Sequence, residues 1–117
     1  MNQQQLKLRT KKFAHDCVDL ALSLPRSAFC NHIRGQLIRA ATSVASNYRA
    51  DNLAHSKPAF AAKISIVLEE ADESGFWIEF LLERSAVTKD TAQPLIQESL
   101  ELVKIFHSTR KTARSRK

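Results

Sequence analysis

Residues 36–82 read QLIRAATSVASNYRADNLAHSKPAFAAKISIVLEEADESGFWIEFLL, and this stretch decides the fold. Its apolar residues recur at intervals of three and four, which is the spacing of helices that bury one face. Ser56 is a favoured N-cap, and Pro58 follows it in the first helical turn, where a proline is tolerated. The stretch therefore predicts two long helices that meet near residue 56.

The same spacing extends to both sides and predicts four helices, over about residues 6–24, 29–53, 56–85 and 91–107. Pro25 ends the first helix, and Thr91 is the expected cap of the fourth. Short connections between long helices predict an all-α fold, an antiparallel up-down-up-down four-helix bundle over residues 1–109. The predicted core comprises the apolar residues at helical spacing: Phe13, Cys17, Leu20, Leu24, Ile33, Leu37, Ala40, Ala41, Val44, Tyr48, Phe60, Ile64, Val67, Ala71, Gly75, Ile78, Leu82, Leu95, Ile96, Leu102, Val103 and Phe106.

The composition agrees with a helical protein. The 117 residues include two glycines and three prolines, fewer turn formers than sheets and long loops need. No stretch approaches the roughly 20 apolar residues of a membrane span, and the N-terminus lacks the apolar core of a secretory signal. Cys17 and Cys30 lack the spacing of a zinc site, so we expect two reduced, buried thiols in a cytoplasmic protein.

The predicted third helix has a second apolar face, because Ile66, Trp77, Phe80 and Leu81 lie off its core stripe. A helix of a four-helix bundle buries one stripe, so this face indicates either a wider core or an oligomer interface. Gly75 stabilises a helix interior by about 1 kcal/mol less than alanine does. We expect it to permit the close approach of another helix.

Polar and acidic residues interrupt the apolar stripes of the central stretch, as they would in an active site. None of the four histidines follows a glutamate by three residues, so the Glu-x-x-His pairs of a di-iron bundle are absent. The acidic cluster at residues 69–73 spreads over more than half of the helix circumference and cannot converge on one metal or substrate. We expect Glu70 to form an ion pair with Arg39 or Lys63. The sequence contains no nucleophile motif and no glycine-rich phosphate loop, so we expect a protein that is not an enzyme and binds no cofactor or metal.

Charge is distributed unevenly along the chain. Residues 1–68 contain ten Lys or Arg and three Asp or Glu, whereas residues 69–109 contain three and nine. The last eight residues, RKTARSRK, have no apolar stripe, so we predict a basic, disordered tail over residues 110–117. In an up-down-up-down bundle both chain ends lie together, and their basic residues would attract the phosphates of RNA or DNA. The candidate nucleic-acid-binding residues are Lys7, Arg9, Lys11, Lys12, Arg110, Lys111, Arg114, Arg116 and Lys117. The alternative is a solvated tail that only aids solubility.

The order of motifs in the central stretch resembles a known family. QLIRAATSVASN (residues 36–47), then Phe60, Lys63 and the run EEADESGFW (residues 69–77), is similar to the proteins encoded in intervening sequences of bacterial large-subunit ribosomal RNA genes. The resemblance covers about residues 10–107. It implies an antiparallel four-helix bundle that is commonly a homopentamer, and it implies no catalytic residues. A related branch consists of accessory proteins to the reverse transcriptases of diversity-generating retroelements, where a basic pentamer contacts enzyme and nucleic acid. Residues 48–51 depart from the Ile-Ala-Glu-Gly-like sequence of many members, which indicates a sub-branch.

Seven residues match the family pattern and form the expected seam between the second and third helices or between subunits: Arg39, Ser43, Asn47, Lys63, Glu70, Glu73 and Trp77. We expect Arg39 and Glu70 to share a buried polar network there. The first functional hypothesis is a non-enzymatic, homo-oligomeric scaffold or accessory factor associated with nucleic acid, of the ribosomal intervening-sequence or reverse-transcriptase accessory type. The alternative is a protein-interaction module that docks a basic partner on its acidic helix face.

Overall fold

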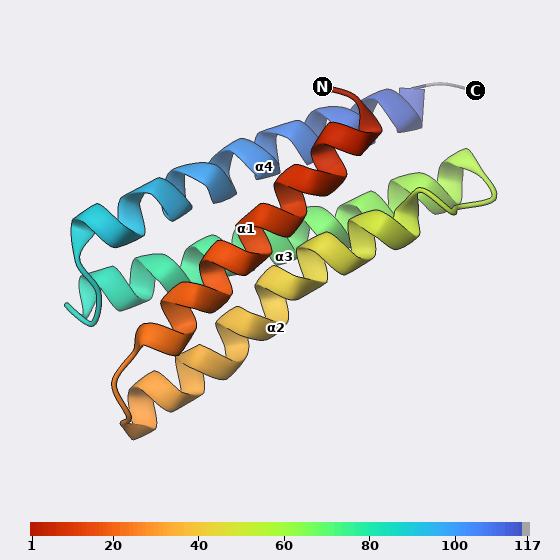
Figure 1. Ribbon diagram of the computed structural model, residues 1–117. Coiled ribbons are helices and arrows are strands. Elements are labelled where there is room, and N and C mark those ends of the chain that lie inside the picture. Colours follow the sequence, from red (N-terminus) through yellow and green to blue (C-terminus); the bar gives the residue numbers. More distant parts are fainter. Residues whose placement is uncertain (116–117) are drawn as a thin grey trace.

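The computed structural model describes residues 1–115, and its secondary structure there is entirely helical. The helices are α1 (Gln3–Ser23), α2 (Ala28–Asp51), α3 (Lys57–Glu83) and α4 (Lys89–Ser115). Each is joined to the next by a short connection, as Figure 1 shows. The all-α fold class predicted from the sequence is confirmed.

The helices pack into an elongated bundle measuring 49 × 20 × 20 Å. Helix α3 packs against both α2 and α4, and α1 packs mainly against α2, with a smaller contact to α4. The start of α1, the end of α4 and the α2–α3 connection lie at the same end of the molecule (Figure 1). None of the helices described is long and apolar enough to cross a membrane.

Side chains at the helix starts explain where each helix begins. Asn2 and Gln5 form a capping box that starts α1 three residues earlier than predicted. The Ser56 hydroxyl accepts a hydrogen bond from the Ala59 N–H at 3.2 Å, so the predicted cap of α3 is confirmed. The predicted cap of α4 is wrong. Thr88 takes this role, and its hydroxyl accepts from the Thr91 N–H at 3.3 Å.

The core follows the predicted apolar stripes. The large side chains that are completely or almost completely buried come from all four helices and include Phe13, Leu37, Ile64, Ile78 and Phe106. Four predicted core residues are only partly buried at its edge: Phe60, Leu82, Leu95 and Val103. Leu81, which was assigned to the second apolar face of the third helix, is fully buried instead. Both cysteines are free and buried, as expected.

Gly75 lies at a close approach of α3 and α4. A Cβ atom at this position would stand 2.4 Å from Ser99 Oγ and 3.2 Å from Ser99 Cβ. The predicted close helix contact is therefore present, and it is made by α4 of the same chain.

The C-terminal segment differs from its prediction as a disordered tail. Helix α4 continues to Ser115, so residues 110–115 are helical. Lys and Arg are good helix formers, and their positive charge favours the C-terminal end of a helix dipole. Arg110 also donates a hydrogen bond to Ser65 Oγ of α3 at 3.2 Å, which anchors this last part of α4 to the bundle. Arg116 and Lys117 lie outside the described residues.

Candidate functional site

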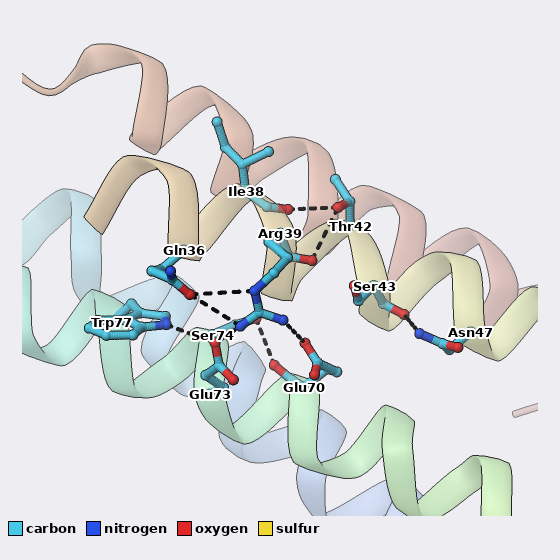
Figure 2. Close-up of polar contacts among 10 residues, drawn as sticks. All are labelled: Gln36, Ile38, Arg39, Thr42, Ser43, Asn47, Glu70, Glu73, Ser74 and Trp77. Atoms are coloured by element: carbon cyan, nitrogen blue, oxygen red, sulfur yellow. Dashed lines mark hydrogen bonds and ion pairs between the residues drawn. The ribbon is translucent and has the colours of Figure 1, made fainter. Parts of the chain in front are cut away.

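The seam between α2 and α3 is centred on Arg39. Its guanidinium reaches from α2 to two carboxylates of α3, pairing with Glu70 at 3.0 Å and with Glu73 (Figure 2). The indole N–H of Trp77 donates to Glu73 at 3.0 Å, so a single carboxylate links the arginine to the tryptophan. The Arg39 guanidinium also donates two longer hydrogen bonds, both 3.4 Å, to the side-chain oxygen of Gln36. The predicted contact between Arg39 and Glu70 is present.

The burial of this network differs from the prediction. The Arg39 side chain is 48% exposed, whereas Glu70 and Glu73 are 19% and 33% exposed. The polar network therefore lies at the surface edge of the helix pair within one chain. Arg39 is half-exposed because it lies beside the buried stripe of α2, which contains Leu37 and Ala40, and not within it.

Three residues of the predicted seam do not join the Arg39 network. The Asn47 side-chain amide donates to the Ser43 backbone carbonyl oxygen at 2.9 Å, so this contact stays within α2 (Figure 2). Lys63 is exposed and makes no ion pair within residues 1–115. Glu70 thus pairs with Arg39, the first of the two partners considered for it.

Aromatic side chains extend the α2–α3 face beyond Trp77. The rings of Phe76 and Phe80 lie 5.9 Å apart, and Phe80 contacts Phe29 of α2 at the same centroid distance. The His32 ring meets the Trp77 ring edge-on at 5.9 Å. Phe76 is 51% exposed and Phe80 is 36% exposed, so this end of the face presents apolar surface to solvent. Phe76 was not included in the predicted second apolar face. Its spacing of four residues from Phe80 places it on the same side of the helix and could have indicated it.

Three of the predicted nucleic-acid-binding residues have partners within the chain. Arg9 of α1 forms two hydrogen bonds to Glu98 of α4, both 2.7 Å, and these bonds raise the pKa of its guanidinium. Lys12 pairs with Asp16 at 2.7 Å, and the hydrogen bond raises the pKa of the ammonium. Arg110 is held by Ser65. Arg9 in particular serves to fasten α1 to α4.

Four of the predicted basic residues make no ion pair within residues 1–115: Lys7, Lys11, Lys111 and Arg114. Lys111 and Arg114 are exposed on the last turns of α4, beside His107 and Arg110. The start of α1 lies at the same end of the bundle (Figure 1), and Lys7 is in the second turn of this helix. We call Lys111 and Arg114 the basic end.

A groove of about 600 Å³ runs between α1 and α2, and it was not predicted from the sequence. Leu8 and Val18 of α1 form its apolar part, and small residues of α2 form the opposite wall. The charged groups at its rim, Lys7, Lys11 and Arg49, are all basic. The groove therefore suits an occupant that is both apolar and acidic.

Asp51, at the end of α2, is a buried carboxylate that the sequence did not single out. Its side chain is fully buried, and neither carboxylate oxygen has a hydrogen-bond partner within the described chain. Burial raises the pKa of Asp51 to about 6, and the nearby Lys63 ammonium opposes this shift. Asp51 is not part of a metal site, because residues 1–115 contain no group of three or more His, Cys, Asp or Glu arranged to hold a metal.

The sequence of this chain matches a known protein family. The family model described as 23S rRNA-intervening sequence protein matches residues 3–108. The chain belongs to this family. The match spans all four helices and ends before the basic last turns of α4, so those turns lie outside what the family model describes.

A solved structure supports the family assignment. The crystal structure of a protein of unknown function from the S23 ribosomal protein family of Bacteroides thetaiotaomicron superposes with a TM-score of 0.81 at 27% identity. The alignment covers 90% of this chain and 97% of that chain. No curated protein matches the chain. The family resemblance inferred from the central stretch is confirmed, and it brings no assigned activity with it.

Proposed function

We propose that this member of the 23S rRNA-intervening sequence protein family is a non-enzymatic scaffold that binds nucleic acid through the basic end of an antiparallel, up-down-up-down, homopentameric bundle. The observation that carries this proposal is the helical continuation of α4 to Ser115. It presents Lys111 and Arg114 on a fixed surface beside the start of α1, without carboxylate partners. Basic side chains on an ordered helix contact phosphates at a smaller entropic cost than those on a disordered tail.

Assembly into a ring would multiply this modest charge. Each copy contributes only a few unpaired basic groups, which is too few for strong binding to a phosphate backbone at physiological salt. Several copies in one ring would engage one nucleic acid together, and the linked contacts raise the overall affinity. Structured RNA is the first ligand to test, because the family takes its name from ribosomal RNA genes.

The test is a titration of fluorescent structured RNA and duplex DNA at several salt concentrations. The paired reversal Lys111→Glu/Arg114→Glu should weaken binding by about tenfold or more and reduce the slope of log affinity against log salt by about two per copy engaged. Lys89→Glu changes one charge at the opposite end of α4 and is the matched control for each single reversal, Lys111→Glu and Arg114→Glu, which should each weaken binding more than the control does. Binding that is independent of salt, or equally affected by the control, would contradict the proposal.

The alternative function, docking of a basic protein on the acidic face of α3, retains one supporting observation. Glu69, Asp72 and Glu79 are exposed and have no ion-pair partner within residues 1–115. A reverse transcriptase is the protein partner that the family resemblance suggests. Stable co-purification with such an enzyme after nuclease treatment would favour this alternative over direct binding of nucleic acid.

A further inference from the structure

Helices α1 and α3 each carry an exposed stripe that the bundle leaves uncovered, and the two stripes have the same spacing. On α1 the stripe is Leu8, Lys11, His15, Val18 and Leu22, and on α3 it is Ile66, Glu69, Glu73, Phe76 and Phe80. Both follow steps of three, four, three and four residues, which is the repeat of helices that pack side by side in coiled coils.

Five of the six apolar members of the two stripes are exposed to solvent, and Val18 is half-buried. Leu8 and Leu22 of α1 are 61% and 65% exposed, and Ile66 and Phe76 of α3 are 45% and 51% exposed. A solvent-facing helix surface usually carries charged or polar residues at such positions. The regular repeat of large apolar residues therefore indicates that another helix covers each stripe.

The charges of the two stripes complement each other position by position. In parallel register Leu8 meets Ile66, Val18 meets Phe76 and Leu22 meets Phe80. The two positions between them bring Lys11 to Glu69 and His15 to Glu73. Lys11 and Glu69 have no ion-pair partner within residues 1–115, whereas Glu73 already binds Arg39. The pair formed by Lys11 and Glu69 is thus the principal electrostatic contact.

We infer that the α1 stripe of one copy packs in parallel against the α3 stripe of a second copy, and that this contact builds the homo-oligomer. The inference rests on the self-assembly in the proposed function and names its two surfaces. The groove between α1 and α2 receives the α3 ridge, and its basic rim and apolar wall match the acidic and apolar residues of that ridge. The basic partner of the acidic α3 face is then the chain itself.

Within one chain, the two stripes span the same part of the long axis of the bundle. Leu22 is near the α1–α2 connection, and Phe80 contacts Phe29 just after that connection. At the other end, Leu8 lines the groove together with Arg49 near the end of α2, and Ile66 is in the first turns of α3. Copies related by rotation alone therefore bring the stripes into register. A contact between two different surfaces forms a closed ring when the rotation between neighbouring copies closes without translation, and the shared register of the stripes meets the second of these conditions.

Both stripes lie on the sides of their helices that are next to α2. The two contact surfaces of one chain are therefore at an angle to each other. The α1 stripe shares its groove with Thr42 and Ser46 of α2, and the α3 stripe touches α2 through Glu73 and Phe80. Inclined surfaces curve an assembly, as a ring requires. This arrangement moves Lys11 from the phosphate-binding candidates to the subunit contact.

Charge reversal with size-exclusion chromatography and light scattering tests the contact. The oligomer should form with the natural sequence, and Lys11→Glu or Glu69→Lys alone should raise the dissociation constant by about tenfold or more. The double variant Lys11→Glu/Glu69→Lys should restore assembly. An equimolar mixture of the two single variants should reassociate more than either variant alone, because a contact between different variants pairs Glu with Lys. In a ring of five, at least one contact still joins two copies of the same variant, so we expect weaker assembly than for the double variant. Glu79→Lys and Lys104→Glu change the same charges off the stripes and should have little effect.

A cross-link tests the register independently of charge. The variant Val18→Cys/Phe76→Cys should form covalent oligomers on oxidation, because these positions face each other between copies. Leu8→Cys/Phe80→Cys places the thiols at opposite ends of the stripes, about 20 Å apart along the helices, and should not. An oligomer that ignores both single reversals, or that cross-links equally in both variants, overturns this inference and leaves the proposed assembly standing. A monomeric natural chain overturns both.

Discussion

At the scale of single residues, the two glycines of the chain occupy opposite environments. Gly75 faces Ser99 of α4 at a distance that admits no Cβ, whereas a Cβ at Gly35 would meet nothing within 4 Å. Gly75 is thus required by packing between α3 and α4. Gly35 has no such requirement within the chain and only lowers the helix propensity of α2.

Replacing each glycine by alanine should therefore change stability in opposite directions. We expect Gly75→Ala to lower the free energy of unfolding by about 1–3 kcal/mol, because α3 and α4 must separate slightly to fit the new methyl group. Gly35→Ala should raise it by about 0.5–1 kcal/mol. Urea unfolding followed by circular dichroism measures both. Equal changes for the two variants would contradict the packing role of Gly75, and Ser99→Ala should partly rescue Gly75→Ala.

Asp51 should make stability depend on pH. Its carboxyl group has a pKa of about 6 in the folded chain and an ordinary value of 3.8 when unfolded. Between these pH values the folded state binds more protons than the unfolded state, so the free energy of unfolding falls as pH rises from about 4 to 6 and then stays low. The expected loss is about 2–3 kcal/mol, from 1.36 kcal/mol per unit of pKa difference.

The variant Asp51→Asn isolates this effect because it removes the charge and keeps the size. It should be equally stable near pH 3 and more stable than the natural chain at pH 7 by the same amount of about 2–3 kcal/mol. The measurement is the difference in unfolding free energy between the two chains across pH, which cancels the titration of the four histidines. A difference that is constant with pH would contradict the burial of an ionised Asp51.

The residues that the sequence identified correctly are those fixed by helical spacing. The stripe through Ile64, Val67 and Ile78 is buried because apolar residues at intervals of three and four have only one face to occupy. The burial of Asp51 and the exposure of Arg39 were not predictable in this way. They depend on how far each helix is rotated against its neighbours, which spacing within one helix does not determine.

At the scale of helices, the α2–α3 seam depends on one arginine that serves two carboxylates. Arg39 holds Glu70 and Glu73 together, so its removal leaves two like charges on adjacent turns of α3. The seam also positions Trp77 through Glu73. This arrangement makes the fluorescence of the only tryptophan a direct reporter of the seam.

A double-mutant cycle should measure the strength of the seam. Arg39→Met keeps the aliphatic length of the side chain, and Glu70→Gln keeps the shape of its partner. We expect a coupling of about 0.5–1 kcal/mol, smaller than for a buried pair because solvent screens the half-exposed guanidinium. The coupling should shrink in 1 M salt. A cycle with Arg9 in place of Arg39 is the control, since Arg9 has no contact with Glu70.

The helix ends were less predictable from the sequence than the helix interiors. Threonine is a good cap at either residue 88 or residue 91, and the structure has Thr88 in this role. The last turns of α4 lack an apolar stripe, yet Arg110 fastens them to Ser65 of a helix 45 residues away in sequence. The contact of Arg110 is tertiary, and local sequence patterns do not contain it.

At the scale of the whole molecule, the opposite charges of the two halves of the chain acquire a structural meaning. The basic half contains α1 and the acidic half contains most of the exposed α3 stripe. In the assembly that we infer, these halves neutralise each other between copies. The basic ends then remain as the unpaired charge, gathered on one side of the ring.

Assembly and nucleic-acid binding should therefore be coupled. Glu69→Lys adds positive charge and leaves Lys7, Lys111 and Arg114 unchanged, so for an isolated chain it should strengthen binding to RNA. If it breaks the ring, the gain from several linked copies is lost, and the affinity for structured RNA should instead fall by about 10- to 100-fold. Glu79→Lys adds the same charge to the same helix outside the stripe and should bind at least as tightly as the natural chain. Fluorescence anisotropy at fixed salt distinguishes the outcomes. A Glu69→Lys chain that binds RNA as tightly as the Glu79→Lys chain would show that nucleic-acid binding does not depend on assembly.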